Sequence, residues 1–309
     1  MIPFLIRRLV GALLALVTVS FITFLLLATG PGDAADALVG EFASQEQLDE
    51  VRASMGLDAP FFQRYLDYMA GAALHQDMGD SLISGRPVAR LIRERLPYTA
   101  LLTLSALTLA AMLGSITGLI AAARPGGWLD LGLMSLTTLG LSVPTFWAAL
   151  LLIHFFSLKL GWLPVTGAGS PAHLVLPTLS LALPLTAMVA RLMRASLLDV
   201  KEADYVRTAR AKGLKPGKVW QGHILRNALI PVLTMLGVYA GRLLAGAVVI
   251  ETVFGWPGLG RLTVQAVLDN DLPVVMGAVL LIAFLYQAIN LGVDILHAWT
   301  DPRVGGSAL

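Results

Sequence analysis

The hydrophobic positions of this chain fall into long continuous runs and do not alternate with polar ones. A membrane-spanning helix needs about 20 mainly apolar residues, and lipid tolerates only helices and closed barrels because it cannot satisfy free backbone groups. Continuous runs of this length predict helices. We expect six, at about 9–29, 99–123, 131–157, 173–195, 228–250 and 274–298. The predicted fold class is therefore an all-α polytopic membrane protein with six transmembrane helices.

Composition supports this prediction. Apolar residues make up 56% of the 309 residues, charged residues make up 14%, and the mean hydropathy is +0.75. A typical soluble domain has about 25% charged residues, so this chain has too few to cover a soluble surface. The first run follows Arg7 and Arg8 and lasts until about Thr29. That is longer than the core of a signal peptide, so we expect a retained first span.

The chain divides at its polar segments. Residues 1–30 hold the first span, 31–98 form the one long hydrophilic segment, 99–300 hold five spans with a loop at 196–227, and 301–309 form a tail. Amphipathic pieces in 31–98 predict a few short helices that make a small outer subdomain, in which Phe61, Phe62, Tyr65 and Tyr68 should find packing partners. A solvated loop is the alternative.

Lysine and arginine set the predicted orientation, because short cytoplasmic loops are enriched in them. With the N-terminus inside, thirteen of these residues lie on the cytoplasmic side, and the short outer loops hold only Lys159 and Arg261. Both termini are therefore predicted to be cytoplasmic and the segment 31–98 to lie outside.

Small residues and prolines predict features of the spans. Gly114 and Gly118 have the GxxxG spacing that permits close helix packing. Pro144, Pro177 and Pro184 lie within or at the ends of spans three and four and predict kinks there.

The segment Arg191–Asn227 is strongly basic, with nine Lys or Arg against three carboxylates. We expect a helix from Asp199 to Lys212, ended by Gly213 in a left-handed conformation, and then a second short helix. Small or apolar contact positions in the first helix are Ala203, Val206, Ala209 and Ala211. The pattern favours a helical hairpin that docks on a protein partner. A basic loop that touches lipid headgroups is the alternative.

The part of this segment that reads DYVRTARAKGLKPGKVWQGHILRNALIP resembles the cytoplasmic coupling loop of ABC-importer permeases, particularly the dipeptide, oligopeptide and nickel branch. Gly213 matches the family glycine and Ala209 the second alanine of its Glu-Ala-Ala pattern, whereas Arg207 and Thr208 replace Glu-Ala. Further family-like stretches occur in the expected order: the opening FLIRRLVGALLALVTVSFITFLLL with PGD, GLDAPFFQRYLDY, DMGDSL, SVPTFW, ETVFGWPGLGR and the ending NLGVDILHAWTDPR. The usual Gly-Asp-Pro of the opening departs here to Gly32-Asp33-Ala34.

The resemblance implies a type I ABC-importer permease fold in a bacterial cytoplasmic membrane. It implies as partners a second related permease, two ABC ATPase subunits and an extracytoplasmic solute-binding protein, with membrane lipid around the spans. The coupling site would comprise Ala203, Asp204, Tyr205, Arg207, Thr208, Ala209, Arg210, Ala211, Lys212 and Gly213. Peptides are the expected solutes, and nickel or a metal chelate is the alternative.

The residues themselves show no catalytic or nucleotide-binding motif. GLKPGK (Gly213–Lys218) has three residues between its glycines where a Walker A loop has four, and Val219 stands where Ser or Thr would bind Mg²⁺. The chain has no cysteine, and its five histidines are scattered. We therefore expect no enzyme activity and no cofactor in this chain, with ATP and Mg²⁺ bound by the partner ATPases. The net charge of +2 is too small to suggest nucleic acid.

Ionisable groups inside spans are costly and are functional candidates. Arg242 lies inside span five and could meet a solute carboxylate or form a structural pair with an acidic residue on a neighbouring helix. Glu251 at the start of the outer loop and Thr145 are further candidates for the pathway. For Asp294, helix pairing is favoured over solute contact. The alternative hypothesis is a secondary transporter or channel that works alone.

Overall fold

The computed structural model describes residues 2–29, 44–54, 58–75 and 77–300, and the predicted tail 301–309 lies outside them. These described segments are helical, apart from turns and one isolated bridge between Asp80 and Pro87. The helices are α1 (Ile2–Thr29), α3 (Gln45–Ser54), α4 (Phe61–Ala70), α5 (Val88–Ala123), α6 (Trp128–Ser142), α7 (Thr145–Leu152), α8 (Ala172–Glu202), α9 (Asp204–Ala211), α10 (Pro216–Val219), α11 (Arg226–Val253), α12 (Leu259–Leu268) and α13 (Leu272–Thr300). Short π-helical turns follow α4 at Gly71–His75, α7 at Ile153–Lys159 and α10 at Trp220–Leu225.

The all-α, six-span prediction is confirmed. Five helices among the described residues are long and apolar enough to cross a membrane, and a sixth span results when α6 and the helix after it are counted together. The second span starts earlier than its apolar run, at Val88 and not at 99. Its charged first part is stabilised by Glu94, which accepts hydrogen bonds from Arg86 at 2.6 Å and from Arg90 at 3.3 Å.

The chain forms two compact units, Met1–Thr99 with Pro257–Leu309, and Ala100–Trp256. The last helix therefore groups with the first one, whereas the division made from the sequence placed 99–300 together.

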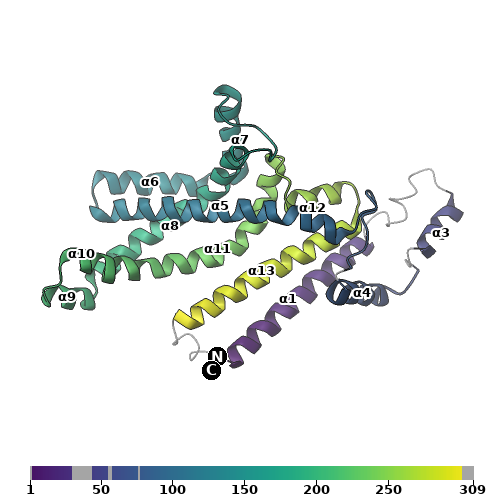
Figure 1. Ribbon diagram of the computed structural model, residues 1–309, viewed down its shortest axis with the longest axis horizontal. Coiled ribbons are helices and arrows are strands. Elements are labelled where there is room, and N and C mark those ends of the chain that lie inside the picture. The colour runs from purple at the N-terminus through teal and green to yellow at the C-terminus, as the bar shows by residue number, and fades with distance from the viewer. Residues whose placement is uncertain (1, 30–43, 55–57, 76, 301–309) are drawn as a thin grey trace. The chain divides into compact units, whose positions relative to one another are not determined.

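In the first unit α1 packs beside α13, and α12 packs on α13 (Figure 1). Arg8 and Asp294 join α1 to α13 by an ion pair of 3.1 Å, which is the helix-pairing role expected for Asp294. A Cβ on Gly277 would lie 2.6 Å from the Val88 side chain, so glycine permits the close approach of α13 to the start of α5.

Three of the four aromatic residues named for the outer segment, Phe61, Tyr65 and Tyr68, pack against α1 as predicted, whereas Phe62 stays 67% exposed. Phe61 and Tyr65 of α4 contact the rings of Phe21 and Phe24 on α1, with ring centroids 5.3–5.7 Å apart. The Tyr65 hydroxyl lies 2.8 Å from that of Ser20. A helix with such partners is a docked element, although residues 31–43 of the predicted subdomain lie outside the described part of the chain.

The second unit is built around α8. This helix packs on α6, α7 and α11 (Figure 1), and its buried residues include Leu185, Val189 and Met193. Gly114 and Gly118 of α5 face it: an added Cβ would lie 2.6 Å from the Val189 side chain or 2.5 Å from the Ala190 carbonyl oxygen, respectively. The close packing predicted from the GxxxG spacing is confirmed.

The predicted third span is not straight. The chain turns by 103° between α6 and α7. Val143 is extended, with φ −84° and ψ 121°, as favoured before a proline, and Pro144 has no N–H with which to continue α6. The kink predicted at Pro144 is confirmed, whereas α8 runs unbroken through Pro177 and Pro184.

Candidate coupling hairpin and solute pathway

The hairpin begins with a break that the sequence pattern did not reveal. Ala203 is extended, with φ −62° and ψ 142°, so α8 ends at Glu202 and α9 starts at Asp204. The prediction of one helix from Asp199 to Lys212 is therefore wrong. The Ala203 carbonyl accepts hydrogen bonds from the N–H groups of Val206 (3.0 Å) and Arg207 (3.2 Å), and the Asp204 carboxylate favours a new helix start because it faces the positive end of the helix dipole.

The other end of α9 is closed by a Schellman motif. Gly213 has φ +74°, its N–H donates to the Arg210 carbonyl at 2.9 Å, and the N–H of Leu214 donates to the Ala209 carbonyl at 3.4 Å. The predicted left-handed glycine is confirmed. It reverses the chain sharply, so α9 and α10 form a short hairpin at the end of α8 and α11 that lies away from α7 (Figure 1). The prediction of a separate second short helix is wrong, because α10 continues through the π-helical turn Trp220–Leu225 into α11 without a break.

The two faces of α9 differ. Val206 and Ala209 are buried in the core of the second unit, and Ala203 is half-buried. Exposed residues are Asp204, Tyr205, Arg207, Thr208, Arg210, Ala211, Lys212 and Gly213. From the sequence, four positions of this segment were expected to make contacts of the same kind: Ala203, Val206, Ala209 and Ala211. In the structure, Val206 and Ala209 pack against other residues of this chain. The surface left for a partner is polar and basic, with Tyr205 on it.

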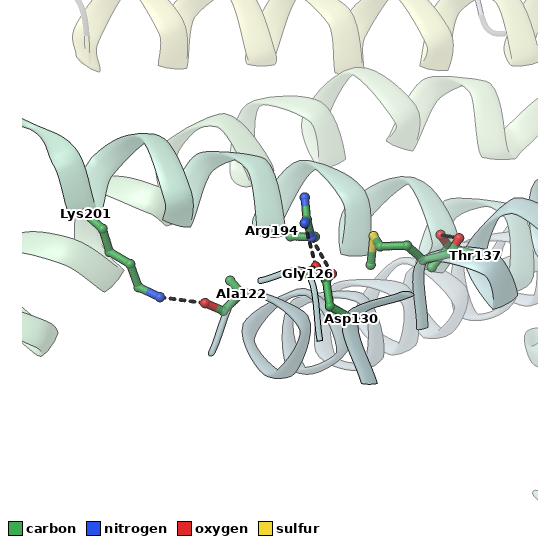
Figure 2. Close-up of polar contacts among 7 residues, drawn as sticks. Ala122, Gly126, Asp130, Thr137, Arg194 and Lys201 are labelled. Atoms are coloured by element: carbon green, nitrogen blue, oxygen red, sulfur yellow. Dashed lines mark hydrogen bonds and ion pairs between the residues drawn. The ribbon is translucent and has the colours of Figure 1, made fainter. Parts of the chain in front are cut away.

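The root of the hairpin is tied to α5. The Lys201 ammonium group donates a hydrogen bond of 2.7 Å to the carbonyl of Ala122, in the last turn of α5 (Figure 2). It also lies 5.3 Å from the centre of the Trp220 ring. The lysine thus satisfies a carbonyl that has no partner within its helix.

An ion pair ties α6 to α8. Arg194 donates two hydrogen bonds to the Asp130 carboxylate, at 2.5 and 2.7 Å, and the Gly126 N–H donates a third at 2.8 Å (Figure 2). Asp130 is 2% exposed. The sequence analysis missed this pair, although an aspartate three residues after the Gly126-Gly127 turn and an arginine in a predicted span were visible signals.

The three pathway candidates lie in different surroundings. Arg242 is exposed on α11, with its guanidinium 5.1 Å from the centre of the Tyr239 ring, and no carboxylate of the described residues pairs with it. Thr145 is the half-buried first residue of α7. Glu251 is fully buried in the last turn of α11, and its carbonyl accepts a hydrogen bond of 2.8 Å from the Trp256 N–H. Thr145 is far from Arg242 and Glu251 in the sequence. Of these three candidates, only Arg242 has a charged side chain that is exposed.

Comparison with known proteins fits this architecture. A profile of the binding-protein-dependent transport system inner membrane component matches residues 114–306, and a profile of the N-terminal part of such membrane components matches residues 1–103. The chain belongs to this family. It is an ABC-importer permease with several membrane spans in the inner membrane.

Its relatives include permeases named for peptides and for glutathione. The permease is 42% identical over 312 residues to a putative peptide transport system permease protein of Brucella suis biovar 1, covering 98% of this chain and 99% of the relative. It is 42% identical over 304 residues to the glutathione transport system permease protein of Escherichia coli strain K12, with the same coverage of 98% and 99%.

Solved structures show the same fold at low sequence identity. The inward-facing MetNI methionine ABC transporter aligns with a TM-score of 0.53 at 22% identity, covering 67% of the permease and 94% of that chain. An amino acid ABC transporter with histidines aligns with a TM-score of 0.51 at 21% identity, covering 69% and 94%. The expected type I permease fold is confirmed.

Proposed function

We propose that this permease carries peptides inward as half of the membrane pathway of an ATP-driven importer, and that α9 transmits the ATPase movement to it. The observation that carries the proposal is the hairpin: an exposed, basic helix held at both ends by the permease's own backbone. Peptides are favoured over nickel as the solute because the relatives reported above are named for peptide and glutathione transport.

The proposed assembly pairs this chain with a second related permease, two ATPase subunits and a solute-binding protein. ATP and Mg²⁺ would bind to the ATPase subunits, and this chain would catalyse no covalent step. In the proposed orientation both termini and the hairpin are cytoplasmic, and the segment 31–98 faces the binding protein. No nucleic acid takes part.

The ATPase movement would be transmitted from α9 to the membrane helices through direct contacts within this chain. A push on the outer face of α9 reaches α8 through the single extended residue Ala203, and it reaches α5 through Lys201 and the carbonyl of Ala122. Helices packed as closely as α5 and α8 are expected to move as a rigid body. Inward release of the solute would follow ATP hydrolysis.

The test is uptake of radiolabelled trialanine into proteoliposomes that hold the complete complex. We expect uptake that needs both internal ATP and the binding protein. Uptake without ATP would support a secondary transporter or channel, and uptake of radioactive nickel in place of the peptide would support the metal alternative.

A further inference from the structure

Three helices of the second unit border an open groove of about 730 Å³. Met134, Ser135 and Thr138 line it from α6, Met188 and Arg191 from α8, and Met235 from α11. Pockets for small ligands commonly have volumes of about 300–1,000 Å³. The groove is therefore large enough for a small peptide, and it lies along helices that can span the membrane.

The charges in the groove are unequal. Arg191 and Arg194 are three residues apart and so lie on neighbouring positions of one helix face. Arg194 is neutralised by Asp130 through two hydrogen bonds. Arg191 is exposed, and its guanidinium has no hydrogen-bond or ion-pair partner among the described residues. The groove thus carries one uncompensated positive charge.

The rest of the lining is adaptable. Methionine side chains are flexible and polarisable and fit ligands of different shapes. The Thr138 hydroxyl donates to the Met134 carbonyl at 3.0 Å, so the lone pairs of its oxygen stay available as acceptors. Such a surface suits solutes that share one charged group and differ in their side chains.

We propose that the groove is a solute site in which Arg191 binds a carboxylate of the transported peptide. Every unmodified peptide has a C-terminal carboxylate, and an arginine recognises it through two parallel hydrogen bonds. This inference rests on the proposed function and names the group that the pathway recognises. A lipid phosphate has similar anionic oxygens, but a lipid would not need the hydroxyls and thioethers that line the groove beside Arg191.

The test uses the fact that this chain has no cysteine. Ser135→Cys places a thiol in the groove, and the whole complex is held in nanodiscs of phosphatidylcholine without anionic lipid. Labelling by a negatively charged and a positively charged methanethiosulfonate reagent is followed by mass spectrometry of this chain. Because Arg191 attracts anions, we expect the ratio of the negative to the positive labelling rate to fall about fivefold when Arg191→Gln is added.

Two controls locate the effect. Arg124→Gln removes an exposed arginine outside the groove and should leave the ratio unchanged, and Arg191→Lys keeps the charge and should retain most of the preference. Trialanine should slow the labelling, and its C-terminal amide should not.

Three outcomes would overturn the site: no labelling of the Ser135→Cys variant, equal protection by trialanine and its amide, or a charge preference seen only with anionic lipid. Each of these leaves ATP-driven uptake to be judged separately, so failure of the groove and failure of the proposed function are distinguishable.

Discussion

Two aspartate–arginine pairs of this permease lie in opposite surroundings. Asp130 and Arg194 are joined by two short hydrogen bonds, and the Asp130 side chain is 2% exposed. Asp204 and Arg207 of α9 are 3.7 Å apart, and their side chains are 98% and 70% exposed. The first pair holds α6 to α8, whereas the second lies on a surface that is open to a partner.

The difference separates two uses of charge in one membrane protein. A buried pair fixes the packing of helices, and removing one partner leaves a charge without compensation. An exposed pair contributes little to stability because water and salt screen it. Folding therefore does not explain the basic residues of α9, and the proposed docking to an ATPase would explain them.

The largest effect is expected at the buried pair. Asp130→Ala should leave Arg194 without its carboxylate and the Gly126 N–H without its acceptor. Breaking a buried ion pair costs about 3–5 kcal/mol, and because Arg194 is partly exposed we expect about 2–3 kcal/mol. Thermal unfolding of the purified permease in detergent measures the loss.

Two variants sharpen this result. Asp130→Leu combined with Arg194→Met removes both charges and should recover most of the lost stability. Asp204→Asn changes the exposed pair and removes a carboxylate from the first turn of α9, so it should lower the unfolding midpoint only slightly, and much less than Asp130→Ala. Equal losses for Asp130→Ala and Asp204→Asn would contradict the distinction between the two pairs.

A smaller effect is expected at the turn of the hairpin. Gly213 and Gly217 both have open space where a Cβ would be added, but only Gly213 has a positive φ, +74°. Gly213→Ala should cost about 1–2 kcal/mol of local strain and should lower the peptide-stimulated ATPase activity of the complex. Gly217→Ala, which lies within α10, should retain that activity. Equal ATPase activities of the Gly213→Ala and Gly217→Ala variants would contradict a specific role for the turn at Gly213.

Much of the fold could be predicted because its signals are local. The apolar runs predicted six spans, Pro144 predicted the bend between α6 and α7, and Gly213 predicted the end of α9. Each depends on the length of a run or on the backbone preference of one residue type. The early start of α5 at Val88 was missed because its first turns are charged and become helical through contacts that hydropathy does not register.

The site could be predicted only in part, because burial depends on residues distant in sequence. The hairpin was found from its basic composition and its glycine, but the break at Ala203 was not, since alanine favours helix and carries no stop signal. Likewise the sequence could not separate Ala209, which packs inside the chain, from Ala211, which is exposed. Nor could it show that Arg194 has a partner 64 residues away while Arg191 has none among the described residues.

Site-specific crosslinking tests most directly whether the exposed face of α9 docks on an ATPase. Ala211→Cys on α9 and Ser170→Cys in the loop before α8 are compared in the assembled complex, each as the single cysteine of this chain. We expect a crosslink from the Ala211→Cys variant to an ATPase subunit and none from the Ser170→Cys variant. A crosslink from the Ser170→Cys variant alone, or from neither, would contradict the assignment of α9 as the coupling helix.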